Sequence, residues 1–283
     1  MNRLKYDLSI IISSYKMERE LPRTIESCLP PFQSDADDYL IEILVLNNDD
    51  TISIAKEDLP KGVTRVINSK RNSGSPVKLM NIGIRKAKSR NLLLIFDGAR
   101  MLSPRVVSNT INVLSKGPYA LSTPLAYHLG KKHQSISTKE GYNVFNEDEL
   151  LAKIDWQRNG NRLFEISSLA DSNRDGHFED INESCAFGIS RKFVRKLGGY
   201  ESKFTSVGGG FATLDLFKRA VEHNKTELFV MLDAGSFHQL HGGISASPNA
   251  PFEIWAEEYR AITGNTYSLP KVNPQFIGSR LIN

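Results

Sequence analysis

Hydrophobic positions in the first hundred residues form continuous apolar runs, separated by stretches of helical periodicity. The runs are rich in Ile, Leu and Val, as in parallel strands that are buried on both faces. In the first helical stretch, Leu21, Ile25 and Cys28 recur at helical spacing. The pattern predicts strands at 8–14, within 41–50, at 64–67 and within 92–98, and helices around 19–29 and within 72–89.

Strands that alternate with helices along the chain indicate a doubly wound, mostly parallel sheet, and hence an α/β fold. In such a sheet, ligands bind beyond the carboxyl ends of the strands. The predicted strands here end in small, polar or charged residues, so we expect a binding site at that edge. The residues at these ends are Ser13, Ser14, Tyr15, Asn47, Asn48, Asp49, Asp50, Asp97 and Arg100.

The pattern is weaker after residue 104. A helix is predicted within 104–117 and a strand within 120–130, followed by a long polar stretch with a helix at 146–156. A long polar insertion in an α/β protein often builds a substrate pocket or a lid. A strand and a basic helix that stops at Gly198–Gly199 then follow within 181–200.

Six motifs occur in an order that is typical of one known family. They are SSYKMERELPRTIESCL, EILVLNNDDT, NSGSPVKLMNIGIRKA, LLLIFDGARMLSP, ESCAFGISRKFVRKLGGYESKF and GGGFATLDLFKRAVEHN. Over residues 6–245 this order resembles the GT-A fold of inverting glycosyltransferases, in particular glycosyltransferase family two. The resemblance implies a Rossmann-like, doubly wound sheet with a smaller acceptor-side subregion.

The resemblance also implies a division of the chain. Residues 1–245 are expected to form a single GT-A domain, with a nucleotide-sugar-binding half over 1–104 and an acceptor-binding half over 105–245. Residues 246–283 are expected to form a C-terminal extension that packs on this domain.

The same resemblance assigns donor-binding roles at the strand ends. Ser13, Tyr15, Asn48 and Asn72 are expected to hold the nucleoside of a nucleotide sugar. Asp97 and Arg100 are expected near the ribose and the diphosphate. An asparagine amide both donates and accepts hydrogen bonds, so the identity of the nucleobase stays open.

The metal site of the family is altered in this sequence. Its second aspartate would fall at Ala99, which leaves Asp97 as the only acid of the pair, and one carboxylate alone is a poor site for a hard cation. Two alternatives remain open. Arg100 can supply positive charge directly, or His238 or His241 can join Asp97 around a divalent cation, Mn²⁺ or Mg²⁺. The Gly242–Gly243 pair favours a turn in which the two histidines converge.

Inverting transfer requires a carboxylate that removes a proton from the attacking hydroxyl. The family's Glu-Asp pair before the acceptor-side helix is replaced by Ala212 and Thr213. The candidate bases are Asp180, Glu183 and Asp215, and we rank Asp215 and Glu183 ahead of Asp180. An acid in the first turn of a helix, as expected for Asp215, is also an ordinary capping feature.

The composition of the chain limits the classes of partner that we expect. The chain has 283 residues, with 36 Lys and Arg against 32 Asp and Glu, a net charge of +4. This balance and the absence of a dedicated motif argue against nucleic-acid binding. The only cysteines, Cys28 and Cys185, lie far apart in the sequence, which argues against a zinc site or a disulfide framework and favours a reducing cytoplasm. The basic run at 85–90 is interpreted as a solvated helix face, with peripheral contact to the inner face of a membrane as the alternative.

The leading hypothesis is a glycosyltransferase that transfers a sugar from a nucleotide-sugar donor to a glycan or lipid-linked saccharide, in bacterial-type surface polysaccharide synthesis. A catalytically weak or inactive sugar-nucleotide-binding protein of the same fold is the alternative, because both familiar acidic pairs are altered. A dinucleotide-binding enzyme is disfavoured, because no G-x-G-x-x-G follows the first strand.

Overall fold

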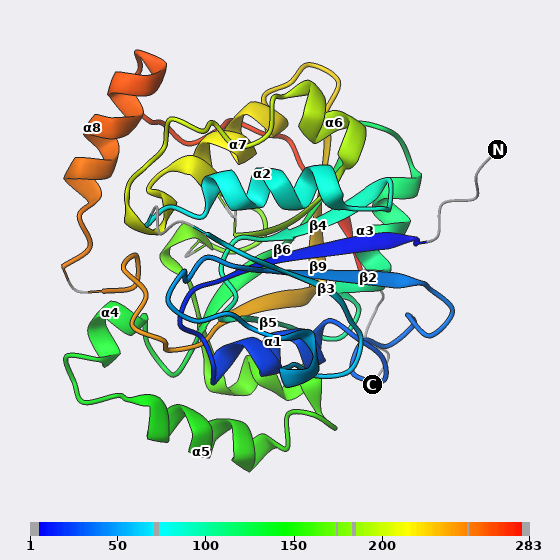
Figure 1. Cartoon of the computed structure of the whole chain (residues 1–283), viewed down its shortest axis with the longest axis vertical. Coiled ribbons are helices and arrows are strands. Elements are labelled where there is room, and N and C mark those ends of the chain that lie inside the picture. Colours follow the sequence, from blue (N-terminus) through cyan, green and yellow to red (C-terminus); the bar gives the residue numbers. More distant parts are fainter. Residues whose placement is uncertain (1–5, 71–73, 174, 183–184, 248, 279–283) are drawn as a thin grey trace.

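A single large mixed sheet forms the centre of the protein. The computed structural model describes residues 6–70, 74–173, 175–182, 185–247 and 249–278. The strand order is β10-β9-β6-β8-β4-β1-β2-β3, with β5 paired to β9 and β7 paired to β6 (Figure 1). The strands are β1 (Leu8–Ser14), β2 (Ile41–Asn47), β3 (Val63–Asn68), β4 (Asn91–Ile95), β5 (Arg100–Leu102), β6 (Ala120–Leu129), β7 (Ser167–Leu169), β8 (Ala186–Ser190), β9 (Glu227–His238) and β10 (Gln275–Ile277).

Helices cover both faces of this sheet, as expected for a doubly wound fold. Alternate residues of β1 point to opposite faces: Ile11 packs in one apolar cluster with α2, α6 and α7, while Ile10 and Ile12 pack in another with α1 and α3. Figure 1 shows α2, α6 and α7 above the sheet and α1 below it. The helices are α1 (Glu20–Ser27), α2 (Val77–Lys86), α3 (Val106–Ser115), α6 (Arg191–Lys196) and α7 (Ala212–Val221).

The sheet changes direction at β8, which runs antiparallel to both β4 and β6. β9 is again parallel to β6, and the short strand β5 is antiparallel to β9. The sequence did not predict β5, because three residues are too few to show a period. Arg100 therefore lies within a strand rather than beyond one. The register places Arg100 and His128 opposite His238 on its two neighbouring strands.

The polar insertion builds a small unit of its own beside the ends of β6 and β9. It contains α4 (Gln134–Ser137), α5 (Val144–Ile154) and η2 (Gly160–Ile166). We call residues 130–154 the α4–α5 segment. Leu151 on α5 and the following Trp156 pack with residues of β5, β6 and β9 in an apolar cluster separate from the two main ones. α5 begins earlier than predicted, because Asn143 caps it by accepting hydrogen bonds from the N–H groups of Phe145 and Asn146.

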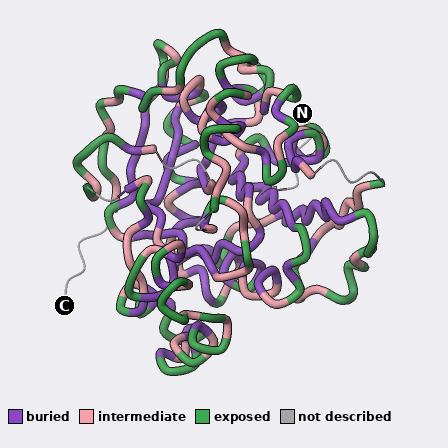
Figure 2. The backbone as a smooth tube through the Cα atoms, turned by 90° about the vertical axis from the view of Figure 1, so that its left-hand side faces the viewer, coloured by how far each residue is buried: buried purple, intermediate pink, exposed green. Residues whose placement is uncertain are grey.

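The C-terminal part contributes α8 (Phe252–Thr263) and β10, which adds a parallel strand to the β9 edge of the sheet. On α8, Trp255 and Tyr259 are buried and pack against Phe211. Figure 2 shows that buried residues concentrate in the interior of the molecule and exposed residues in its outer segments. In the described part of the chain, no helix is both long and apolar enough to span a membrane. The remaining short helices are η1 (Lys56–Asp58), η3 (Asp171–Asn173) and η4 (Val207–Gly209).

Candidate active site

Asp97, His238 and His241 converge at the edge of the sheet. Asp97 follows β4, His238 ends β9, and His241 lies in the turn after it. The Nε2 atoms of His238 and His241 lie 2.9 and 3.4 Å from Asp97 Oδ2, and 3.2 Å from each other. The side chain of Asp97 is 20% exposed while both imidazoles are largely buried, so solvent reaches the cluster at the carboxylate.

The backbone at Ala99 ties this cluster together. The Ala99 N–H donates to Asp97 Oδ1 at 3.0 Å, which leaves Oδ2 for the histidines. The Ala99 carbonyl accepts a hydrogen bond from the Gln239 N–H at 2.8 Å and joins the two turns that carry the cluster. The position where the family resemblance implies a second acid is therefore fully buried and structural.

Gln134 on α4 fixes the orientation of His238. Its Nε2 donates to the His238 carbonyl at 3.0 Å, so its Oε1 is the atom that lies 2.7 Å from His238 Nδ1. An amide oxygen only accepts, and Nδ1 therefore carries the ring hydrogen. The lone pair of His238 is consequently on Nε2, which points at Asp97.

Burial and mutual charge shift the pKa values of all three groups of the cluster. Burial lowers the pKa of His238 to about 4, although Asp97 opposes this shift. Burial also works against an ionised Asp97, but the neighbouring His241 and His238 hold its pKa well below the usual range. For His241, the Asp97 carboxylate outweighs the effect of burial and raises the pKa. The Nε2 atom of His238 and the carboxylate oxygen Oδ2 of Asp97 lie 2.9 Å apart.

Arg100 adds positive charge beside the cluster. It is 6% exposed, and its Nη1 donates to Ser236 Oγ at 3.2 Å. Together with burial, its charge lowers the pKa of His238. The sequence placed Arg100 near this site but did not indicate that a strand holds it there.

His128, which sequence reasoning missed, completes the row across the strands. Burial lowers its pKa to about 2, and its ring centroid lies 5.2 Å from that of His238. The pairing of β6 with β9 places His128 beside His238, and the sequence pattern did not predict this pairing.

Glu147 on α5 anchors the turn that carries His241. Its Oε2 accepts the Leu240 N–H at 2.7 Å, and Arg19 Nη2 lies 2.8 Å from its Oε1. Arg19 also contacts Asp148 at 2.6 Å and donates to the Leu240 carbonyl. Burial raises the pKa of Glu147 to about 7, although Leu240 and Arg19 favour its ionised form. Arg19 and Glu147, which are more than a hundred residues apart in the sequence, thereby hold the same turn at Leu240.

A cavity of about 210 Å³ lies at the ends of β1 and β2. Ser13 and Asn48 are buried and Tyr15 is 39% exposed, but none of the three lines the cavity. Asp49 does line it. The lining residues are Lys16, Met17, Glu18, Leu21, Pro22, Asn47, Asp49, Ile52, Ser53, Ile54, Asp58 and Leu59.

Asp49 was named among the strand-end residues but not assigned a role. Its Oδ1 accepts hydrogen bonds from the N–H and the hydroxyl of Thr51. Its Oδ2 is buried and has no hydrogen-bond partner in the described part of the chain. Asn72 and Glu183, two other predicted site residues, lie outside the described residues.

Asp215 lies in the first turn of α7 and is 5% exposed. Its Oδ2 accepts a hydrogen bond from Arg219 Nε at 2.8 Å. Arg219 also donates to the carbonyls of Leu197 and Gly199, so the pair ties α7 to the turn after α6. The ion pair gives Asp215 a structural contact, and its assignment as the base stays a prediction.

Two solved structures share the fold. A structure of GalNAc-T7 with UDP, GalNAc and Mn²⁺ aligns with a TM-score of 0.53 and 15% identity, over 85% of this chain and 45% of that one. A structure of S. aureus TarS 1-349 in complex with UDP aligns with a TM-score of 0.53 and 13% identity, over 89% of this chain and 65% of that one. The protein thus spans less than two thirds of either chain. These likenesses confirm the predicted GT-A fold.

A search of the curated proteins finds no match. The sequence profile described as Glycosyl transferase family 2 matches residues 9–198, which is more than half of the chain. This match covers the strands that carry Asp97 and Arg100. The protein therefore belongs to glycosyl transferase family 2.

Proposed function

We propose that the protein transfers a sugar, with inversion, from a nucleoside diphosphate donor to a glycan or lipid-linked saccharide of bacterial-type surface polysaccharide. The observation that carries this proposal is the Asp97, His238 and His241 cluster with Arg100 beside it. It lies at the edge of the sheet where doubly wound folds bind their ligands. Membership of the family supports the same reaction.

The cluster fits a divalent cation. Each of its three residues offers one ligand atom, and these atoms lie within 4.8 Å of one another. The Asp97 carboxylate oxygen and His238 Nε2, 2.9 Å apart, are both able to bind a cation. Mixed nitrogen and oxygen ligands suit Mn²⁺ better than Mg²⁺, which prefers oxygen alone. A bound cation would neutralise the charge of the leaving diphosphate. The GalNAc-T7 structure contains Mn²⁺ and UDP.

Other residues of the chain are proposed to bind the phosphates and the nucleoside and to orient His238. Arg100 adds a fixed positive charge beside the phosphates. Gln134 keeps the lone pair of His238 aimed at the site. The cavity beside β2 receives the nucleoside, and the unpartnered oxygen of Asp49 accepts an N–H from the base. Ser13, Tyr15 and Asn48, at the adjoining strand ends, are proposed to contact the nucleoside as well.

The acceptor hydroxyl loses its proton to a carboxylate during inverting transfer. Asp215 is the first candidate for this base and Glu183 is the second. If Asp215 is the base, Asp215→Asn lowers kcat by about 10²- to 10⁴-fold and leaves UDP affinity unchanged. Arg219→Gln removes the ion-pair partner while the carboxylate stays, and serves as the matched control. A variant Asp215→Asn that keeps full kcat contradicts this assignment.

The alternative is a sugar-nucleotide-binding protein without turnover. Ala99, Ala212 and Thr213 stand where the family resemblance implies acids, and this observation favours it. Donor hydrolysis and transfer over a panel of nucleotide sugars, with Mn²⁺ or with EDTA, separates the two. Turnover that EDTA abolishes supports the transferase. Tight nucleotide binding without any turnover supports the alternative.

A further inference from the structure

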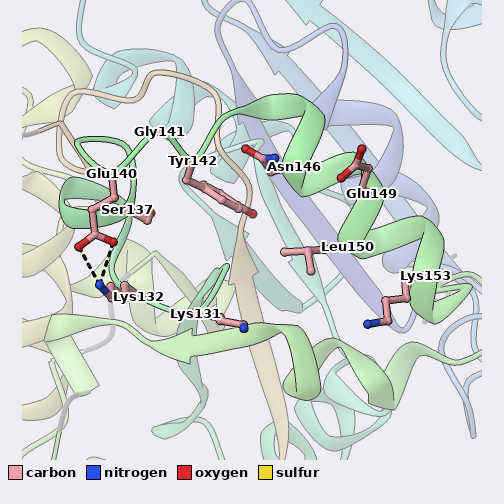
Figure 3. A pocket seen from close by; sticks show the side chains of 10 residues that line it. All are labelled: Lys131, Lys132, Ser137, Glu140, Gly141, Tyr142, Asn146, Glu149, Leu150 and Lys153. Carbon is pink, nitrogen blue, oxygen red and sulfur yellow. Dashed lines mark hydrogen bonds and ion pairs between the residues drawn. The ribbon is translucent and has the colours of Figure 1, made fainter.

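A second cavity, of about 630 Å³, lies in the α4–α5 segment, outside the strand-edge site. Its volume is in the range of sites that bind small organic molecules. Figure 3 shows its lining side chains, which come from the loop after β6, from α4, from the turn before α5 and from α5 itself. They are Lys131, Lys132, Ser137, Glu140, Gly141, Tyr142, Asn146, Glu149, Leu150 and Lys153.

Positive charge dominates one side of this cavity. Lys132 is paired with Glu140, with 2.7 Å between Nζ and Oε1. No described residue forms a hydrogen bond or an ion pair with the ammonium groups of Lys131 and Lys153. In Figure 3, these two side chains extend toward one another across the cavity. Among the lining residues, two ammonium groups therefore remain against one carboxylate, that of Glu149.

Two buried hydroxyl groups at the cavity also have no hydrogen-bond partner in the described part of the chain. They are Ser137 Oγ, on a side chain whose residue is only 7% exposed, and Tyr142 Oη. An unpaired buried hydroxyl is costly, and a ligand that offers oxygen atoms would remove this cost. The Tyr142 ring packs over Gly130, and Leu150 adds apolar surface.

We propose that this cavity binds a saccharide unit that carries a phosphate or carboxylate group. The ammonium groups of Lys131 and Lys153 recognise the anion. The hydroxyls of Ser137 and Tyr142 bond to sugar oxygens, and the Tyr142 ring offers a flat apolar face to the sugar. A small inorganic anion would fill little of the volume, and a neutral sugar would leave the two ammonium groups without a counter-charge.

This cavity is separate from the Asp97, His238 and His241 cluster, and ligand binding in it does not depend on whether that cluster transfers a sugar. The two are joined by α4, in which Gln134 holds His238 and Ser137 lines the cavity. This placement suits an anionic group on the acceptor glycan.

Isothermal titration calorimetry with glucuronic acid, glucose 6-phosphate and glucose tests the proposal. We expect both acidic sugars to bind the wild-type protein, and glucose to bind at least about tenfold more weakly. The double variant Lys131→Ala and Lys153→Ala should lose at least about tenfold in affinity for the acidic sugars. The double variant Lys61→Ala and Lys86→Ala, which removes the same charge from exposed positions elsewhere, should bind as the wild type does.

A second variant, Tyr142→Phe, keeps the ring and removes only the hydroxyl, and should weaken binding less than the double lysine variant. UDP affinity should stay unchanged in all these proteins, which separates failure at this cavity from failure at the strand edge. Equal affinity of the wild type and the Lys131 and Lys153 variant overturns the proposal. Loss of acidic-sugar binding only in Arg100→Ala, or no binding to the wild type, overturns it as well.

Discussion

The sheet and the α4–α5 segment position the polar groups of the candidate site by different means. At the sheet edge, backbone pairing sets the geometry: β5 and β6 flank β9 and place Arg100 and His128 beside His238. In the α4–α5 segment, single side chains do so, as Gln134 and Glu147 reach across to hold His238 and Leu240. The difference shows that the sheet places His238 and its neighbours, while side chains of a less regular segment orient His238 and hold the turn that leads to His241.

The largest effect is expected at the sheet edge itself. Asp97→Asn removes the only carboxylate of the cluster and one of its ligand atoms. We expect kcat/KM for transfer to fall by about 10²- to 10³-fold, in line with the loss of a charged group that stabilises a transition state. Steady-state kinetics with saturating Mn²⁺ measures this. Wild-type rates in this variant would show that the cluster is not the reactive site.

Gln134→Leu tests the α4–α5 segment. The leucine has a similar size but cannot hold the Nδ1 hydrogen or the carbonyl of His238. We expect Mn²⁺ affinity to fall by about 10- to 100-fold, which is the usual cost of losing such a supporting partner. Gln134→Glu keeps an acceptor for Nδ1 and should restore part of the affinity. Equal affinities for all three proteins would mean that sheet pairing alone orients His238.

The pH dependence of stability tests the Glu147 anchor. Its pKa is raised in the folded state from 4.5 to about 7, so the folded protein holds an extra proton between these values. The stabilisation is fully present below about pH 4.5 and is lost as the pH rises toward 7, by up to about 3 kcal/mol. Chemical unfolding of the wild type and Glu147→Gln should show their free-energy difference shrinking by this amount. A difference that does not vary with pH would contradict the shift.

The smallest effect is expected at the helix cap of α5. Asn143→Ala removes the side-chain oxygen that accepts the N–H groups of Phe145 and Asn146. The free energy of unfolding should fall by about 1 kcal/mol. Asn143→Asp keeps the cap and is the control. UDP affinity should stay unchanged in both, because the cap does not touch the cluster; a loss of affinity would show tighter coupling between the two regions than we infer.

The central strands, and the position of Asp97 just after β4, were predictable because each depends on a local pattern. β1, β2 and β4 are continuous apolar runs, and a run that stops at Asp97–Gly98 indicates where its strand ends. The turn that brings His238 and His241 together was indicated by the Gly242–Gly243 pair that follows it. Such signals lie within a few residues of the feature that they predict.

The rest depended on contacts that no local pattern contains. Gln134 and His238 are 104 residues apart, and Arg19 and Glu147 are 128 residues apart. At the cavity beside β2, Asp49 is a lining residue and its neighbour Asn48 is not. The hydrogen bonds of the Asp49 turn decide which of the two side chains faces the cavity, and strand periodicity does not describe that turn.

The affinity of UDP with and without Mn²⁺, in the wild type and in Asp97→Asn, tests the central claim most directly. If the Asp97, His238 and His241 cluster holds a cation against the diphosphate, Mn²⁺ should strengthen UDP binding to the wild type by at least about tenfold. It should strengthen binding to Asp97→Asn little or not at all. The same enhancement in both proteins, or none in the wild type, would contradict the proposed role of the cluster.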